Sequence, residues 1–129
     1  MRYLLDTVVL IRHLVGKGKI GSKASYVLEH IYNSDDSLLV SVISLMEVMY
    51  LSEKNRIDIN LEDTLDSIES SSKYAIVDLN SDVLRVAKTI NFYELHDRLI
   101  LATAKWLQIP ILSSDAKFSA MEGIEVIWN

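Results

Sequence analysis

The chain alternates short apolar runs with longer stretches of helical periodicity, and this alternation restricts the fold more than any other feature. The apolar runs are typical of buried strands, and the stretches between them repeat apolar residues at helical spacing. This order predicts an α/β fold with a mostly parallel central sheet flanked by helices. We expect strands at residues 2–5, 38–42, 74–77, 111–112 and 125–128.

Helices are expected between these strands. Ser44 is a plausible N-cap for one of them, because Glu47 follows three residues later as in a capping box. No internal repeat, low-complexity tract or linker is visible, so we expect one domain over residues 1–129. The expected helices cover residues 7–14, 22–32, 44–55, 61–70 and 80–90, and a last one begins after Glu94 or His96 and ends near residue 108.

Composition excludes several classes of protein. The 129 residues contain no cysteine, which excludes disulfides and thiolate metal sites. We expect no transmembrane helix, because no run of about 18 apolar residues exists. A charge near the first residue argues against a signal peptide, so a cytoplasmic location is expected. The net charge of −5 provides no long-range attraction for nucleic acid.

Four acidic residues stand next to runs that otherwise read as buried core. Asp6 ends the first strand, Glu47 interrupts the apolar stretch 42–49, Asp97 opens a helical stretch and Asp115 follows the strand at 111–112. Without these four, 14 acidic residues remain against 13 basic ones, so most of the net charge resides in them. Carboxylates beside a core need compensation.

In open parallel sheets, ligand sites lie beyond the carboxyl ends of the strands, and all four acids map to that edge. Converging carboxylates repel one another, and a bound Mg²⁺ or Mn²⁺ is the simplest compensation. Such ions make a nucleophile from water near neutral pH and neutralise charge on phosphoryl oxygens. The pattern therefore points to metal-assisted phosphate chemistry, with one or two ions.

Four segments resemble the PIN domain, and most closely the VapC-like ribonuclease toxins of prokaryotic toxin–antitoxin pairs. They surround the four acids in the family's order, at residues 3–11, 41–48, 95–104 and 111–115. The resemblance implies a parallel sheet, Asp6, Glu47, Asp97 and Asp115 as catalytic Mg²⁺ or Mn²⁺ ligands, and hydrolysis of single-stranded RNA. It also implies a homodimer and a cognate antitoxin that inserts a C-terminal segment at the acids.

The same resemblance assigns supporting residues. Ser113 matches a hydroxyl position that orients a ligand or a metal-bound water, and Thr7 matches the hydroxyl after the first acid. Val8 departs from the family, which usually has a polar residue there. Valine cannot hydrogen-bond around the first carboxylate, so we expect activity to persist but to be weakened.

Each acid also has a purely structural interpretation. Asp6 fits a helix N-cap, Glu47 a capping-box partner, Asp97 a first-turn acid that the helix dipole favours, and Asp115 a turn residue. Met46, Met49, Tyr50 and Leu51 read as core residues of the Glu47 helix. An exposed part of that helix would instead suit a dimer surface or an antitoxin groove.

Basic residues are the candidates for contact with RNA phosphates. Those between Thr7 and Leu28 either steer an RNA backbone or form a solvated surface, and Arg98 either contacts phosphate or pairs with an acid. The candidate contacts are Arg12, Lys17, Lys19, Lys23 and Arg98.

Three other functions stay open at this point. The first is an RNA-processing nuclease of the same kind without an antitoxin, and the second is a binding module whose site has decayed, suggested by Val8. The third is a phosphotransferase of the haloacid dehalogenase type, which also begins with an Asp after its first strand. That chemistry needs a second Asp where this chain has Val8.

Overall fold

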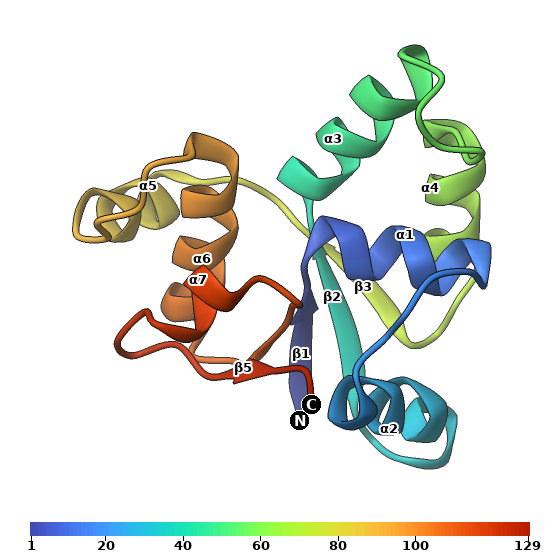
Figure 1. The fold of residues 1–129 in the computed structure, drawn as a ribbon, viewed down its shortest axis with the longest axis horizontal. Coiled ribbons are helices and arrows are strands. Elements are labelled where there is room, and N and C mark those ends of the chain that lie inside the picture. Colours follow the sequence, from blue (N-terminus) through green and yellow to red (C-terminus); the bar gives the residue numbers. More distant parts are fainter.

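A computed structural model describes all of residues 1–129, and its strands form one sheet, as predicted. The strands are β1 (Arg2–Leu5), β2 (Ser37–Ser41), β3 (Tyr74–Val77), β4 (Ile111–Leu112) and β5 (Val126–Ile127). They lie in the order β3-β2-β1-β4-β5, and every neighbouring pair is parallel. β1 is therefore central, and the carboxyl ends of the strands meet at one edge (Figure 1).

The helices connect successive strands, with an additional 3-10 turn at Ile31–Asn33. They are α1 (Thr7–Val15), α2 (Ser22–His30), α3 (Val42–Glu53), α4 (Leu61–Glu69), α5 (Ser81–Lys88), α6 (Leu95–Leu107) and α7 (Ala116–Ser119). Figure 1 shows α5, α6 and α7 on one side of the sheet and α1, α2 and α4 on the other. None of them combines the length and the apolar character that a bilayer-spanning helix needs.

Two buried clusters hold these layers together, because successive strand residues point to opposite faces of the sheet. Leu4 of β1 joins the cluster formed with α5, α6 and α7, which contains Ile100 and Phe118. Its neighbour Leu5 joins the other cluster, together with Leu10 of α1. Apolar residues on both faces of β1 explain why the first strand reads as a continuous apolar run.

α3 begins at Val42, because Ser41 rather than Ser44 is its N-cap. The Ser41 hydroxyl oxygen accepts a hydrogen bond from the Ile43 amide at 3.0 Å. The predicted capping box of Ser44 and Glu47 is therefore wrong, and Ser44 lies fully buried inside the helix. The strand before it accordingly ends at Ser41.

Two further expectations fail in the helices. The side chains of Met46, Met49 and Tyr50 are 38%, 39% and 52% exposed, so they are not core residues. α3 is apolar on both sides, and its buried side is formed by other residues of the helix. α7 has no counterpart among the expected helices, because four residues are too few to reveal a helical period.

Replacing the fully buried Leu101 of α6 by alanine should lower the free energy of unfolding by about 2–5 kcal/mol, because a cavity remains in the core. The matched control is Leu84→Ala in α5, where the leucine is 51% exposed and the loss should stay below about 1 kcal/mol. Urea denaturation of both variants measures the difference, and equal losses would contradict the described packing.

Candidate active site

The four acidic residues singled out in the sequence lie at the carboxyl edge of the sheet. Asp6 directly follows β1, and Asp115 follows β4 after two serines. Glu47 lies in the second turn of α3, which begins where β2 ends, and Asp97 lies in the first turn of α6. Because β2, β1 and β4 are neighbours, three of the acids follow adjacent strands.

Asp6 is the most buried of the four, and both of its carboxylate oxygens accept hydrogen bonds. Oδ1 accepts from the Thr7 amide at 2.8 Å, which makes Asp6 the N-cap of α1. Oδ2 accepts from the Ser113 hydroxyl at 2.8 Å. Burial raises the pKa of Asp6, whereas these two hydrogen bonds oppose the rise. The capping role predicted as an alternative therefore coexists with a position at the site.

Thr7 connects the first acid to the second. Its hydroxyl donates to Glu47 Oε1 at 2.6 Å and lies 2.9 Å from the Ser44 hydroxyl oxygen. A hydroxyl has one proton, so Ser44 supplies the proton of the second contact. Burial raises the pKa of Glu47, and the Thr7 hydrogen bond partly offsets this. Thr7 thus fixes one oxygen of Glu47 from the start of α1.

Asp97 is the acid most affected by the others. Burial and then the carboxylates of Asp6, Glu94, Glu47 and Asp115 raise its pKa to about 7. All three other predicted acids thus act on Asp97, so the structure brings the four into one electrostatic cluster. Its amide donates to Glu94 Oε2 at 2.6 Å, which makes Glu94 the N-cap of α6.

Asp115 is also a helix cap. Its Oδ1 accepts from the Lys117 amide at 2.8 Å at the start of α7, and its own amide donates to the Ser113 hydroxyl oxygen at 3.1 Å. Ser113 therefore links Asp6 and Asp115 through one hydroxyl group. This position supports its predicted supporting role, through contact with two acids.

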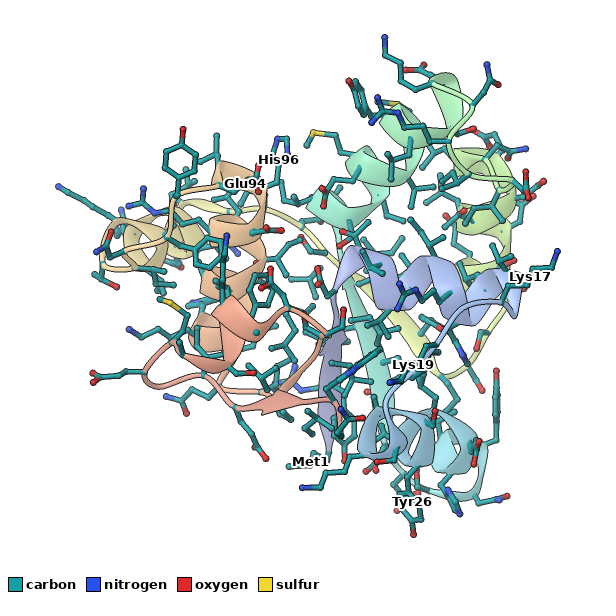
Figure 2. The ribbon with its side chains drawn as sticks, viewed as in Figure 1. Met1, Lys17, Lys19, Tyr26, Glu94 and His96 are labelled. Carbon is teal, nitrogen blue, oxygen red and sulfur yellow. The ribbon has the colours of Figure 1, made fainter.

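No lysine or arginine forms an ion pair with the four acids, and the one positive charge that acts on them is that of His96, which opposes the rise that burial causes in the pKa of Glu47. The ion pairs of the chain are the N-terminus with Asp36, Arg85 with Asp82, and the contact of His96 with Glu94, in which 3.5 Å separate His96 Nδ1 and Glu94 Oε1. None includes one of the four acids. Figure 2 shows Glu94 and His96 at the N-terminal end of α6, on the side toward α3. The cluster is thus a site of excess negative charge.

Sequence reasoning gave two residues of this region other roles. Ser44 was assigned a helix cap but hydrogen-bonds Thr7, which is 37 positions away. Glu94 is a fifth carboxylate, which contributes to the raised pKa of both Asp97 and Glu47. The signal for Glu94 is its position three residues before Asp97, where a cap that accepts from the Asp97 amide belongs.

The basic candidates form no ion pair with the four acids. Figure 2 shows Lys17 at the C-terminal end of α1 and Lys19 on the connection between α1 and α2. Arg12 Nη1 donates to the Lys19 carbonyl at 2.8 Å. Arg98 Nε donates to the carbonyl of Ala87 at 2.7 Å, so it joins α6 to the end of α5. It forms no ion pair with an acid.

The donor set fits a hard divalent cation. Carboxylate and water oxygens are the ligands that Mg²⁺ and Mn²⁺ prefer, and the acids of this cluster form no ion pair with a lysine or arginine. The side chains do not form a ready-made cage, since no three His, Asp or Glu side chains stand close enough together to hold an ion. Mg²⁺ usually takes one or two carboxylates and keeps several waters, so it needs no such cage.

The raised pKa of Asp97 predicts how the metal-free protein responds to pH. The native state binds the Asp97 proton more tightly than the unfolded state, because the pKa rises from 3.8 to about 7 on folding. This contribution to stability is complete below pH 3.8 and is lost as pH rises through about 7. Thermal unfolding between these limits should show stability that falls as pH increases.

Asp97→Asn should flatten that dependence, whereas Asp35→Asn, at an exposed loop residue before β2, should leave it unchanged. The same pH dependence in wild type and Asp97→Asn would show that the acids do not act on one another.

Known structures share this fold. VapBC2 from Rickettsia felis, bound to a promoter DNA fragment, is 17% identical, with a TM-score of 0.77 over 100% of both chains. DNA-bound VapBC from Salmonella typhimurium is 19% identical, with a TM-score of 0.71 over 98% of this chain and 97% of the other. A toxin-antitoxin complex from Klebsiella pneumoniae is 21% identical, with a TM-score of 0.66 over 97% and 95%.

At these identities the likeness shows the fold alone. No curated protein sequence matches the chain. The family model of the PIN domain, however, matches residues 3–124, which include all four acids and the whole of the sheet except its last strand. The chain belongs to the PIN domain family.

Proposed function

We propose that the protein is a Mg²⁺- or Mn²⁺-dependent ribonuclease that hydrolyses phosphodiester bonds of single-stranded RNA. The observation that carries this proposal is the cluster of four carboxylates without a lysine or arginine partner at the carboxyl edge of the sheet. Membership of the PIN domain family supports it. The same family membership argues against the haloacid dehalogenase alternative, as does Val8 in place of the second Asp.

The residues of the site have distinct tasks in this proposal. Asp6, Glu47, Asp97 and Asp115 would hold the cation, which supplies charge neutralisation at the phosphate and a more acidic water. Thr7 and Ser113 keep the carboxylates of Glu47 and Asp6 in fixed orientations through hydrogen bonds of 2.6 and 2.8 Å. This preorganisation lowers the cost of arranging charge when the phosphodiester bond breaks.

We further propose that the ribonuclease is the toxin of a type II toxin–antitoxin pair and forms a homodimer. The solved neighbours support the antitoxin, since they are VapBC assemblies and one is described as a toxin-antitoxin complex, whereas the homodimer is proposed from the family resemblance alone. An antitoxin segment with a basic side chain would match the negative charge of the cluster. Coexpression with a small protein encoded next to this chain, followed by copurification, tests the partnership.

Cleavage of a labelled single-stranded RNA of mixed sequence tests the enzymatic proposal. Wild type should cut the RNA with Mg²⁺ or Mn²⁺ and stop when EDTA is added. Asp6→Asn should lower the rate roughly 100-fold or more, because it removes a charge from the centre of the cluster. Asp35→Asn makes the same chemical change at a loop residue before β2 and should leave the rate unchanged.

Calorimetric titration with Mn²⁺ separates the alternatives. A wild-type protein that binds Mn²⁺ but leaves every tested RNA intact would favour the decayed binding module over the nuclease. A protein that neither binds the ion nor cuts RNA would contradict the metal site itself.

A further inference from the structure

A partly open pocket of about 410 Å³ adjoins the acid cluster and has no task in the function proposed above. It lies between α3 and the start of α6, and Glu47 belongs both to its lining and to the cluster. A polynucleotide with a phosphate at the acids would therefore have a neighbouring nucleoside within reach of this pocket. The other lining residues that matter are Met46, Met49, Tyr50, Glu53 and His96.

The pocket exposes apolar groups that the fold does not use. Met46, Met49 and Tyr50 are between 38% and 52% exposed, on the side of α3 that faces away from the core. A concave surface lined by exposed apolar side chains is more often a binding site than a surface without a function. An aromatic ring flanked by thioethers suits a flat, polarisable ring.

The charges of the pocket favour a base over a phosphate. Its lining contains the carboxylates of Glu47 and Glu53 and no lysine or arginine, so a phosphate would be repelled there. Lys54 is not among the lining residues, but its Nζ lies over the Tyr50 ring, 5.7 Å from the ring centre. A nucleotide could thus place its base inside the pocket and its phosphate beside Lys54.

We propose that this pocket binds the nucleobase adjacent to the scissile phosphate, with Tyr50 as its stacking surface. The proposal rests on the ribonuclease function proposed above. Aromatic side chains bind unpaired bases of single-stranded RNA by stacking. Glu53 accepts hydrogen bonds but cannot donate them, so it can accept from the amino or ring N–H groups of a base and does not by itself select one base.

Binding can be observed without cleavage, through the four methionines of the chain. Met46 and Met49 line the pocket, whereas Met1 lies at the opposite end of the molecule (Figure 2) and Met121 packs against the core. With carbon-labelled methionine methyl groups, NMR titration with CMP in the presence of Mg²⁺ should shift Met46 and Met49 and leave Met1 and Met121 unchanged. CMP and UMP should shift the same two methyl groups, because stacking on Tyr50 tolerates either base.

Substitutions of Tyr50 test the stacking surface. Tyr50→Ala should raise the Kd for CMP and the KM for RNA by about five-fold or more, with kcat nearly unchanged, whereas Tyr50→Phe should keep wild-type values. The matched control is Tyr26→Ala, at a tyrosine of α2 that is 63% exposed and far from the pocket (Figure 2). Circular dichroism confirms that each variant is folded.

The outcomes separate this proposal from the one on which it rests. Methionine shifts with CMP in a protein that cuts no RNA would support the base pocket and contradict the ribonuclease. Cleavage without shifts at Met46 and Met49, or with no effect of Tyr50→Ala on KM, would overturn the pocket alone. Shifts that follow protein concentration rather than CMP would also overturn it, because a second copy of the chain would then be the occupant.

Discussion

The central position of β1 is the constraint on which the site depends. Parallel pairing with β2 on one side and β4 on the other places the carboxyl ends of these strands together. The Asp6 amide, which donates to the Leu112 carbonyl at 3.0 Å, continues this pairing into the site itself. A shift of one residue in either strand would turn the side chains to the opposite faces and separate the acids.

In this arrangement, the packing of the core opposes the electrostatic repulsion between the carboxylates. Burial, followed by the neighbouring carboxylates of Asp6, Glu94, Glu47 and Asp115, raises the pKa of Asp97 to about 7, which is unfavourable for a folded protein at neutral pH. Two buried clusters, one on each face of the sheet, hold the strands in place against this repulsion. The hydrogen bonds from Thr7 and Ser113 then select which oxygens face the centre of the cluster. The folded chain in this way keeps the carboxylates close together, where their combined negative charge attracts a cation.

Features that depend on local sequence could be predicted. The resemblance to the PIN domain is confirmed, and so are the α/β fold, the parallel sheet and nearly all helices, since apolar period and helix signals decide them. The placement of the acids at one edge follows from the order of strands and helices. The sequence could not show that Ser44 contacts Thr7 or that Arg98 bonds the Ala87 carbonyl, because these contacts join distant parts of the chain.

The sequence also could not show which residues of α3 are buried. The helix is apolar on both sides, so its period does not reveal which side faces the core, and Met46, Met49 and Tyr50 are exposed instead. Likewise, Lys17 is close to Asp6 in sequence but lies beyond the far end of α1 (Figure 2). A helix separates the residues at its two ends, so residues that are close in sequence can lie far from one another in space.

The most direct measurement of the central claim is a crystal soaked in Mn²⁺ and examined for anomalous density near Asp6. We expect one or two peaks within coordinating distance of the Asp6 carboxylate, with further carboxylates of the cluster turned toward them. The absence of any peak at neutral pH and saturating Mn²⁺, or side chains that point to separate surfaces, would contradict the assignment of these acids to a metal centre.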